Sequence, residues 1–203
     1  MTSLKLYGAP KTRTVRTLWM MAELDLPYEL IPISTHDRGN LAPDYLAVNP
    51  GGKVPAIDDD GFVLSESMAV NLYLAKKHGG ALYPATPQGE ARAWQWSFWA
   101  VTEVDKTIID WALHSSVLPE AERDSRRARA ARLELERPLA VLENALKTET
   151  WLVEGRFTVA DLNAASVMYR ALWMDLDDKP PVRDWLHRCW DRPAARQARA
   201  MRE

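Results

Sequence analysis

Cysteine is almost absent from this chain of 203 residues, which contains only Cys189. A single thiol cannot form an intrachain disulfide, and so few cysteines are typical of proteins from reducing compartments. No apolar run approaches the roughly 18 residues that a membrane helix needs, and the first ten residues lack the apolar stretch of a secretory signal. We therefore expect a cytoplasmic protein that has no membrane partner.

The sequence also lacks an excess of charge of either sign. Its 26 Lys and Arg residues nearly balance 28 Asp and Glu residues, and the formal net charge is −2. The arginine-rich stretch from Glu120 to Arg137 contains almost as many acidic residues, which is typical of a solvated helix with internal ion pairs. We therefore expect no nucleic-acid partner.

Strand patterns are confined to the first part of the chain. Short apolar runs there alternate with helical spacing, and they predict strands at 4–7, 28–33, 55–57 and 62–64, helices at 13–23 and 65–78, and a short helix or turn at 41–48. Later residues show only helical spacing, which predicts helices at 90–114, 120–147 (interrupted or bent near Pro138), 158–173, 182–190 and 194–202.

These patterns predict two domains. Residues 1–81 should form an α/β domain with the order βαβ-ββα, and residues 88–203 should form an all-helical domain. Residues 82–87 contain two prolines and little periodicity, so they are expected to be the linker. In the second domain, Thr158 and Asp161 have the spacing of a capping box, which indicates a structural element at the start of a helix.

The segment from Asn49 to Ser67, NPGGKVPAIDDDGFVLSES, is the most informative part of the sequence. Pro55 leads directly into an apolar strand, and proline in strands is confined to edges, starts and bulges. The segment ends where a helix is expected to open on Ser65-Glu66-Ser67, and free amides at a helix start can bind an anion. Together these features predict a pocket for an extended, peptide-like ligand that carries a carboxylate.

Taken in order, several segments resemble those of the glutathione transferases. NPGGKVPAI resembles the segment that precedes the family's cis-proline, LSES resembles its Glu-Ser element, and GRFTVADLNAA resembles its capping-box segment. The resemblance covers nearly the whole chain. It implies a thioredoxin-like N-terminal domain, a helical C-terminal domain, glutathione as co-substrate and a cytosolic homodimer.

The resemblance also implies binding roles for residues in the first domain. Val54 would pair its backbone N–H and C=O with the cysteinyl part of glutathione, with Pro55 holding the chain in shape. Ser67 would bind the γ-glutamyl carboxylate, and Glu66 would bind its ammonium group. Capping of the helix start is the structural alternative for Glu66 and Ser67.

Three polar residues are candidates for a further carboxylate of the ligand, namely Lys53, His36 and Arg38. Each is also compatible with a solvated loop. In the second domain Trp99 is a candidate for the pocket of the apolar co-substrate, although Trp96, Trp99 and Glu103 share one helix face that could equally be core or dimer contact.

The hydroxyl that would stabilise the glutathione thiolate remains open between candidates. In the theta-like and delta-like branches a serine lies four residues ahead of an arginine, and here Thr12 and Arg16 have that spacing. Thr12 is therefore the first candidate, although its β-methyl restricts the hydroxyl and it is equally placed to cap the helix. Thr14 is its neighbour, and Tyr7 corresponds to the tyrosine of other branches.

The implied activity is attack of the glutathione thiolate on a small apolar electrophile, for which no metal is required. Glutathione-dependent disulfide reductase, peroxidase or isomerase chemistry in the same site is one alternative. A non-catalytic binding or scaffold protein with the same fold is the other.

Overall fold

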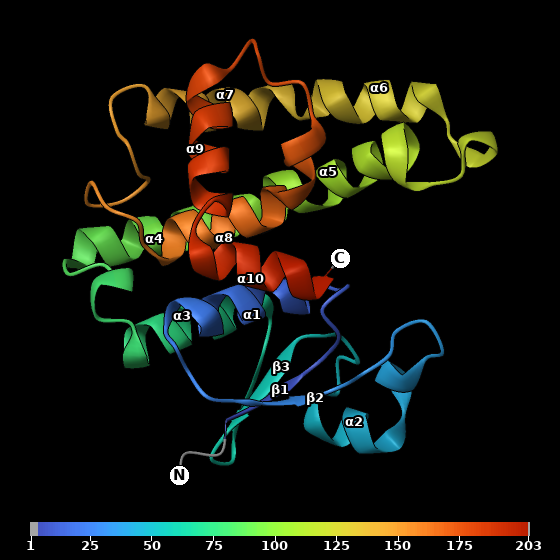
Figure 1. Ribbon diagram of the computed structural model, residues 1–203, viewed down its shortest axis with the longest axis vertical. Coiled ribbons are helices and arrows are strands. Elements are labelled where there is room, and N and C mark those ends of the chain that lie inside the picture. Colours follow the sequence, from blue (N-terminus) through green and yellow to red (C-terminus); the bar gives the residue numbers. More distant parts are fainter. Residues whose placement is uncertain (1–3, 203) are drawn as a thin grey trace. The chain divides into compact units, whose positions relative to one another are not determined.

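The computed structural model describes residues 4–202, which form two compact units (Figure 1). The first unit runs as far as Tyr83 and also takes in the residues from Asp191 onward, and the second spans Pro84–Trp190. A mixed sheet with helices makes up the first unit, and helices make up the second. The predicted fold class, α/β followed by all-α, is confirmed.

A four-stranded sheet with the order β2-β1-β3-β4 is the centre of the first unit. Its strands are β1 (Leu4–Tyr7), β2 (Glu29–Ile31), β3 (Ala56–Asp59) and β4 (Phe62–Ser65). The β1–β2 pair is parallel, whereas β1–β3 and β3–β4 are antiparallel. The hairpin between β3 and β4 turns at Asp60 and Gly61, which both have positive φ, as a tight two-residue turn requires.

The helices of the first unit are α1 (Thr14–Glu23), α2 (Pro43–Val48), α3 (Ser67–His78) and α10 (Pro193–Arg202). In Figure 1, α1 and α3 lie together on one side of the sheet and α10 runs beside α1, which its contacts with α1 confirm. Apolar spacing predicted α10 as a helix, but not that it would pack on the first unit. Leu18 and Trp19 of α1 are both buried. Helix α1 must therefore pack against other elements on more than one side.

The second unit contains α4 (Pro87–Trp99), α5 (Asp105–Ala112), α6 (Ser125–Glu134), α7 (Glu136–Leu146), α8 (Val159–Val167) and α9 (Pro180–Trp190). The helix expected over 90–114 is widened into π-helical turns at Ala100–Val104 and Leu113–Val117. The helix expected over 120–147 begins only at Ser125 and is divided at Leu135. The break lies just before Pro138, because proline has no N–H for the preceding turn and its ring collides with that turn.

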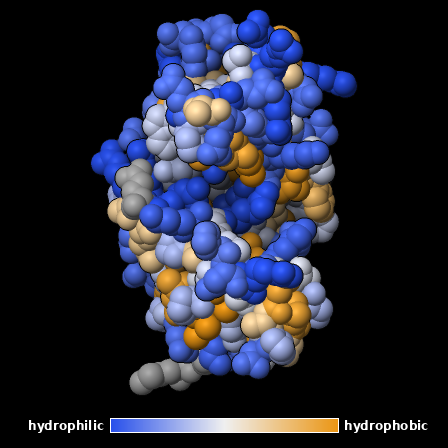
Figure 2. All heavy atoms as spheres, turned by 90° about the vertical axis from the view of Figure 1, so that its right-hand side faces the viewer, coloured by the Kyte–Doolittle hydropathy of each residue, from blue (hydrophilic) through white to orange (hydrophobic). Residues whose placement is uncertain are grey.

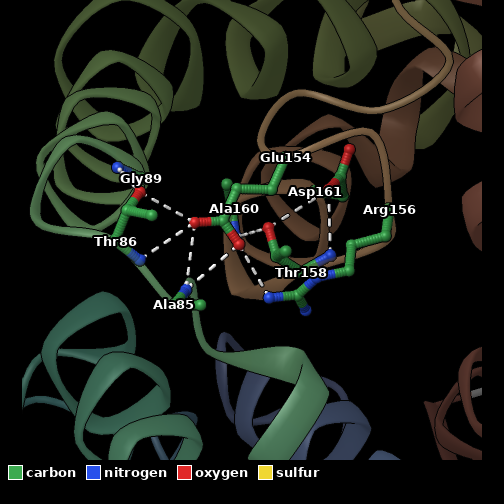
Figure 3. Close-up of polar contacts among 8 residues, drawn as sticks. All are labelled: Ala85, Thr86, Gly89, Glu154, Arg156, Thr158, Ala160 and Asp161. Carbon is green, nitrogen blue, oxygen red and sulfur yellow. Dashed lines mark hydrogen bonds and ion pairs between the residues drawn. The ribbon is translucent and has the colours of Figure 1, made fainter.

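One carboxylate fastens the start of α4, as Figure 3 shows. Glu154 accepts hydrogen bonds from the backbone N–H groups of Ala85 and Thr86 at 3.0 Å and 3.1 Å, and it pairs with Arg156 at 2.8 Å. Hydrogen bonding from Ala85 is the main reason that the pKa of Glu154 is lowered. Gly89 allows this approach, because a Cβ there would lie 2.4 Å from the carboxylate.

The predicted capping box at the start of α8 is confirmed. The Thr158 hydroxyl accepts from the backbone of the first helical turn, and Asp161 accepts from the Thr158 N–H at 3.0 Å. Asp161 also accepts from the Leu152 N–H and the Trp185 indole N–H, each at 2.9 Å. The carboxylate therefore joins three segments of the second unit, and its side chain is fully buried.

Hydrophilic side chains predominate on the face drawn in Figure 2, where hydrophobic side chains form several separate areas. Among residues 4–202, no helix combines the length and the apolar character that crossing a membrane requires.

Burial of Asp161 generates a prediction for stability against pH. Burial raises the pKa of this carboxyl from 3.8 to about 6, so between these values the folded chain holds a proton that the unfolded chain releases. Stability is therefore lost as pH rises through this window. Relative to Asp161→Asn, the free energy of unfolding of the wild type should fall by up to about 3 kcal/mol from about pH 4 to about pH 6.

Urea unfolding at several pH values measures this difference. Asp191→Asn is the matched control, because Asp191 is an exposed carboxylate whose partner is the exposed Arg196. A wild-type stability that follows the Asp161→Asn curve at every pH would show that the buried carboxyl does not take up the proton.

Candidate functional site

The register of the sheet brings the candidate segments to one end of it. Tyr7, the last residue of β1, pairs with Ala56, the first residue of β3, and Ala56 pairs in turn with Ser65, the last residue of β4. Tyr7 also pairs with Ile31 at the end of β2. The segments that follow β1, β2 and β4 and the one that precedes β3 therefore all begin at the same edge of the sheet.

The loop before β3 is held by side chains from and around α2. The backbone carbonyl of Lys53 accepts from the Tyr45 hydroxyl at 2.6 Å and from the Asn49 side chain at 2.7 Å. Gly52 has a positive φ of 58°, and its carbonyl accepts from the Asn40 side chain at 2.6 Å. Three side chains therefore hold the two carbonyl groups that precede Val54.

Val54 and Pro55 are joined by a cis peptide bond. Pro55 is buried and lies just ahead of β3, not within the strand as the sequence pattern predicted. Among the described residues, neither the N–H nor the C=O of Val54 pairs with another backbone group. Val54 is only half-buried, and a backbone N–H and C=O without backbone partners are the groups with which an extended ligand pairs.

Glu66 and Ser67 lie where β4 passes into α3. Glu66 is exposed at the N-cap position with φ of 68° and makes no side-chain hydrogen bond to the helix, whereas Ser67 is the buried first residue of α3. A non-glycine residue at positive φ is strained, and such strain is found at functional sites. The structural alternative, capping of the helix by the Glu66 side chain, is therefore not observed, and the first amides of α3 remain available to an anion.

The turn between β1 and α1 contains a chain of two hydroxyl groups. Thr12 Oγ1 donates to the carbonyl of Ala9 at 2.7 Å, and it lies 2.9 Å from Thr14 Oγ1. Since the Thr12 proton goes to Ala9, Thr14 is the donor in the second bond. The Thr14 N–H also donates to Thr12 Oγ1, at 3.2 Å. The Thr12 oxygen therefore accepts two bonds from the start of α1, which polarise its own O–H group.

The other two hydroxyl candidates are placed differently from Thr12. Thr14 is completely buried behind Thr12, so its hydroxyl is shielded from a ligand. Tyr7 lies at the end of β1, half-buried, with its ring 6.0 Å from the ring of Tyr45 and tilted against it. Of the three, Thr12 is the hydroxyl that is both partly exposed and attached to the helix start.

The candidate cations occupy exposed positions in the loops of this end of the sheet. Lys53 is exposed beside Val54, and His36 and Arg38 are exposed in the loop after β2. Arg38 has φ of 63°, and the loop is tied to Gly52 through Asn40. The structure therefore brings these three residues into neighbouring loops.

Trp99 belongs to the second unit. It ends α4, and its ring meets the ring of Trp96 edge-on with centroids 5.1 Å apart. Its indole N–H is buried, and the described residues provide no hydrogen-bond partner for it. Trp96 is buried, Trp99 is half-buried and Glu103 is exposed. The predicted shared face therefore extends from the core of the second unit to its surface.

Sequence reasoning missed the residues that hold the site's backbone. Tyr45, Asn49 and Asn40 act through their hydrogen bonds to loop carbonyls, and a polar residue in a loop gives no sign of this from its type alone. Burial of Asn49 is the signal that identifies it, because a buried amide must be paired. Within residues 4–202, no group of three or more His, Cys, Asp or Glu side chains is arranged to hold a metal ion.

Comparison with known proteins matches both parts of the chain to one family. Residues 2–76 match the glutathione S-transferase N-terminal domain, and residues 104–193 match the glutathione S-transferase C-terminal domain. Glutathione S-transferase GstB of Escherichia coli (strain K12) is 30% identical over 191 residues, which cover 92% of each chain. The chain belongs to the cytosolic glutathione S-transferase superfamily.

Two further relatives have informative descriptions. The disulfide-bond oxidoreductase YfcG of Escherichia coli (strain K12) is 30% identical over 209 residues, covering 95% of this chain and 93% of YfcG. A theta class glutathione S-transferase from the citrus canker pathogen Xanthomonas axonopodis pv. citri, solved with glutathione bound, is 32% identical with a TM-score of 0.88. That match covers 98% of this chain and 97% of the solved chain.

The close packing behind Thr12 generates a prediction for Gly8. A Cβ on Gly8 would lie 2.0 Å from Thr14 Oγ1, and the residue has φ of 149°. Gly8→Ala should therefore lower the free energy of unfolding by more than the roughly 1–3 kcal/mol expected from backbone strain alone.

Gly61→Ala supplies the comparison, because Gly61 has φ of 91° and nothing within 4 Å of an added Cβ. Denaturant unfolding of both variants measures the difference. Equal losses of stability would mean that the turn absorbs the methyl group without disturbing Thr14.

Proposed function

We propose that this protein is a glutathione transferase, in which glutathione lies along the sheet end that carries Val54, Glu66 and Ser67. The observation that carries the proposal is that, within residues 4–202, the backbone of Val54 pairs with no other backbone group and no side chain caps the start of α3. An extended peptide needs an exposed N–H and C=O for its own backbone, and its carboxylate needs amide donors. Both lie at the same end of one sheet because of the register.

Each part of glutathione has a matching group. The cysteinyl backbone would pair with Val54, the γ-glutamyl carboxylate would accept from Ser67 and the first amides of α3, and Glu66 would bind the ammonium group. The glycyl carboxylate would lie near the exposed side chains of Lys53, His36 and Arg38, one or more of which would bind it.

Thr12 is the proposed donor to the sulfur. A thiol has an ordinary pKa of about 8.5, and lowering it by two pH units requires about 2.7 kcal/mol of preference for the thiolate. A hydrogen bond to a charged acceptor supplies about 1.5–3 kcal/mol, and the start of a helix adds about 0.3–1 kcal/mol. The Thr12 proton would turn from the Ala9 carbonyl to the sulfur, because an anionic acceptor forms the stronger bond.

The reaction that follows is nucleophilic substitution or addition by the thiolate. In substitution, the sulfur lone pair forms the new bond to carbon, the leaving group departs with its electron pair, and the thiol proton passes to solvent. The electrophile is expected to be small and apolar. Trp99, which is half-buried in the second unit, is the side chain proposed for the pocket of this apolar co-substrate.

A second candidate activity is glutathione-dependent disulfide reduction in the same site, which the likeness to YfcG favours. The thiolate would attack one sulfur of a disulfide, forming a mixed disulfide and displacing the other sulfur as a thiolate. A second glutathione thiolate would then attack the glutathione sulfur of the mixed disulfide and release the remaining thiolate, which gives oxidised glutathione. The two activities are separated by their products. Conjugation of an activated aryl chloride gives a thioether, whereas reduction of a small dialkyl disulfide gives oxidised glutathione. A glutathione-binding protein without catalysis would give neither product.

Binding of glutathione should depend strongly on Ser67. Its hydroxyl and the adjacent amides would meet the γ-glutamyl carboxylate, and hydrogen bonds to charged groups contribute about 1.5–3 kcal/mol. We predict that Ser67→Ala weakens glutathione binding by roughly 10-fold to 150-fold in calorimetric titration.

Ser65→Ala is the matched control, because Ser65 is the last residue of β4 and lies outside the proposed contacts. It should bind glutathione like the wild type. Unchanged affinity in Ser67→Ala would remove this residue from the site, and a wild type that does not bind glutathione would refute the proposed function.

We further propose that the protein is a homodimer, as the family resemblance implies. In the second unit, the exposed apolar residues Trp94, Phe98 and Val101 follow one another at helical spacing along one face. In the first unit, Phe62 and Val63 are exposed on β4. Exposed apolar patches of this kind are typical of surfaces that another protein covers.

Sedimentation analysis tests the dimer. The wild type should have twice the chain mass of 23.0 kDa, and Phe98→Asp should shift it toward the monomer, because a carboxylate would be buried without a partner. Leu133→Asp is the matched control: Leu133 is 67% exposed on α6, comparable with 63% for Phe98 on α4. A monomeric wild type, or equal effects of the two variants, would contradict this interface.

A further inference from the structure

The C-terminal helix α10 is attached to α1 near both of its ends by arginine side chains. Near its start, Arg192 forms two hydrogen bonds with the carboxylate of Glu23, at 2.6 Å and 2.7 Å. Glu23 ends α1 and also accepts from the indole N–H of Trp19 at 2.9 Å. Near the end of α10, Arg202 reaches the turn that precedes α1. The last residues of the chain are therefore part of the unit that contains the proposed glutathione site.

Arg202 bonds to the backbone of the turn that presents the Thr12 hydroxyl. Its Nη1 donates to the carbonyl of Thr12 at 3.2 Å and to the carbonyl of Pro10 at 3.5 Å. The Thr12 carbonyl also accepts from the Val15 N–H at 3.3 Å, where the first turn of α1 begins. One guanidinium group thus joins two peptide groups on either side of Lys11, and these set the direction of the Thr12 side chain.

We propose that Arg202 is a positioning residue for the thiol-activating turn, and that its charge also favours the thiolate form of bound glutathione. The electrostatic part of the inference rests on the proposed function, whereas the positioning part rests on the hydrogen bonds alone. A guanidinium group is always charged at neutral pH, and here one of its terminal nitrogens, Nη1, reaches both carbonyls. Lysine would keep the charge, but its side chain is shorter and would not bring its nitrogen to the position of Nη1.

Two nearby arginines, Arg192 just before α10 and Arg196 within it, have different partners. Arg192 is engaged by the carboxylate of Glu23, whose side chain is 7% exposed, so its loss would leave a buried charge unpaired and lower stability. Arg196 is 67% exposed and pairs with Asp191 on the surface, so its loss should change little. These two arginines therefore serve as a stability control and a surface control for the same residue type.

The test compares Arg202→Met, Arg202→Lys, Arg192→Met and Arg196→Met. The first measurement is amide hydrogen exchange of the peptide that covers residues 8–13, without glutathione. The second is the ultraviolet absorbance of bound thiolate against pH at saturating glutathione. Arg202→Met should speed exchange in the turn and raise the thiol titration midpoint by about half a pH unit to one pH unit.

The controls make the expected pattern specific. Arg202→Lys should recover part of the shift in midpoint, because it restores the charge, but little of the protection from exchange. Arg192→Met should lower the unfolding temperature and leave the midpoint where it is in the wild type. Arg196→Met should change neither quantity.

Three results would overturn the inference in whole or in part. If Arg202→Met leaves both the exchange and a lowered wild-type midpoint unchanged, Arg202 does not act on the turn, although the proposed function stands. If the exchange rises but the midpoint does not, the charge has no effect on the thiol, and the inference as stated fails. A wild-type midpoint equal to that of free glutathione refutes the proposed function and, with it, the electrostatic role of Arg202.

Discussion

The alignment of β1, β3 and β4 is the constraint on which the rest of the site depends. Because Tyr7 pairs with Ala56 and Ala56 with Ser65, the Thr12 turn, the Val54-Pro55 bond and the start of α3 begin at neighbouring points of one sheet edge. A slip of one residue would turn every side chain of a strand to the opposite face. Burial of Leu6 and Ile57 on the covered face opposes such a slip.

A second layer of contacts fixes the loops that leave this edge. The carbonyls of Lys53 and Gly52 are held by side chains, and those of Pro10 and Thr12 are held by Arg202. These bonds leave the groups of Val54 unpaired among the described residues. A binding surface made largely of backbone atoms needs such support, since its specificity comes from the placement of amides and carbonyls and not from side-chain identity.

Much of the fold could be predicted from the sequence. Hydrophobic spacing is a local property, so the strands, the hairpin at Asp60-Gly61 and the capping box at Thr158 and Asp161 were found within a few residues. Pro138 also indicated the interruption that the structure places at Leu135. The π-helical turns of the α4–α5 region were not predicted, because they depend on packing within the second unit. The attachment of α10 to α1 was also missed, since it joins residues almost the whole chain apart.

For the candidate site, too, the local features could be predicted from the sequence and the contacts between distant residues could not. Val54, Pro55, Glu66 and Ser67 lie in one continuous motif, and their roles in binding remain predictions that the geometry supports. Choosing between Thr12, Thr14 and Tyr7 required burial and hydrogen bonds, which a single sequence does not contain. Arg202 could not be proposed at all without coordinates, because its role depends on two carbonyls far away in the sequence.

Titration of the thiol of bound glutathione tests the central claim most directly. Ultraviolet absorbance against pH, at saturating glutathione, should show a wild-type midpoint well below the ordinary value of about 8.5. Thr12→Val keeps the β-branched shape and removes only the hydroxyl, so its midpoint should rise by about one to two pH units, whereas Tyr7→Phe should leave it unchanged. A midpoint that stays in place in Thr12→Val and rises in Tyr7→Phe would contradict the account.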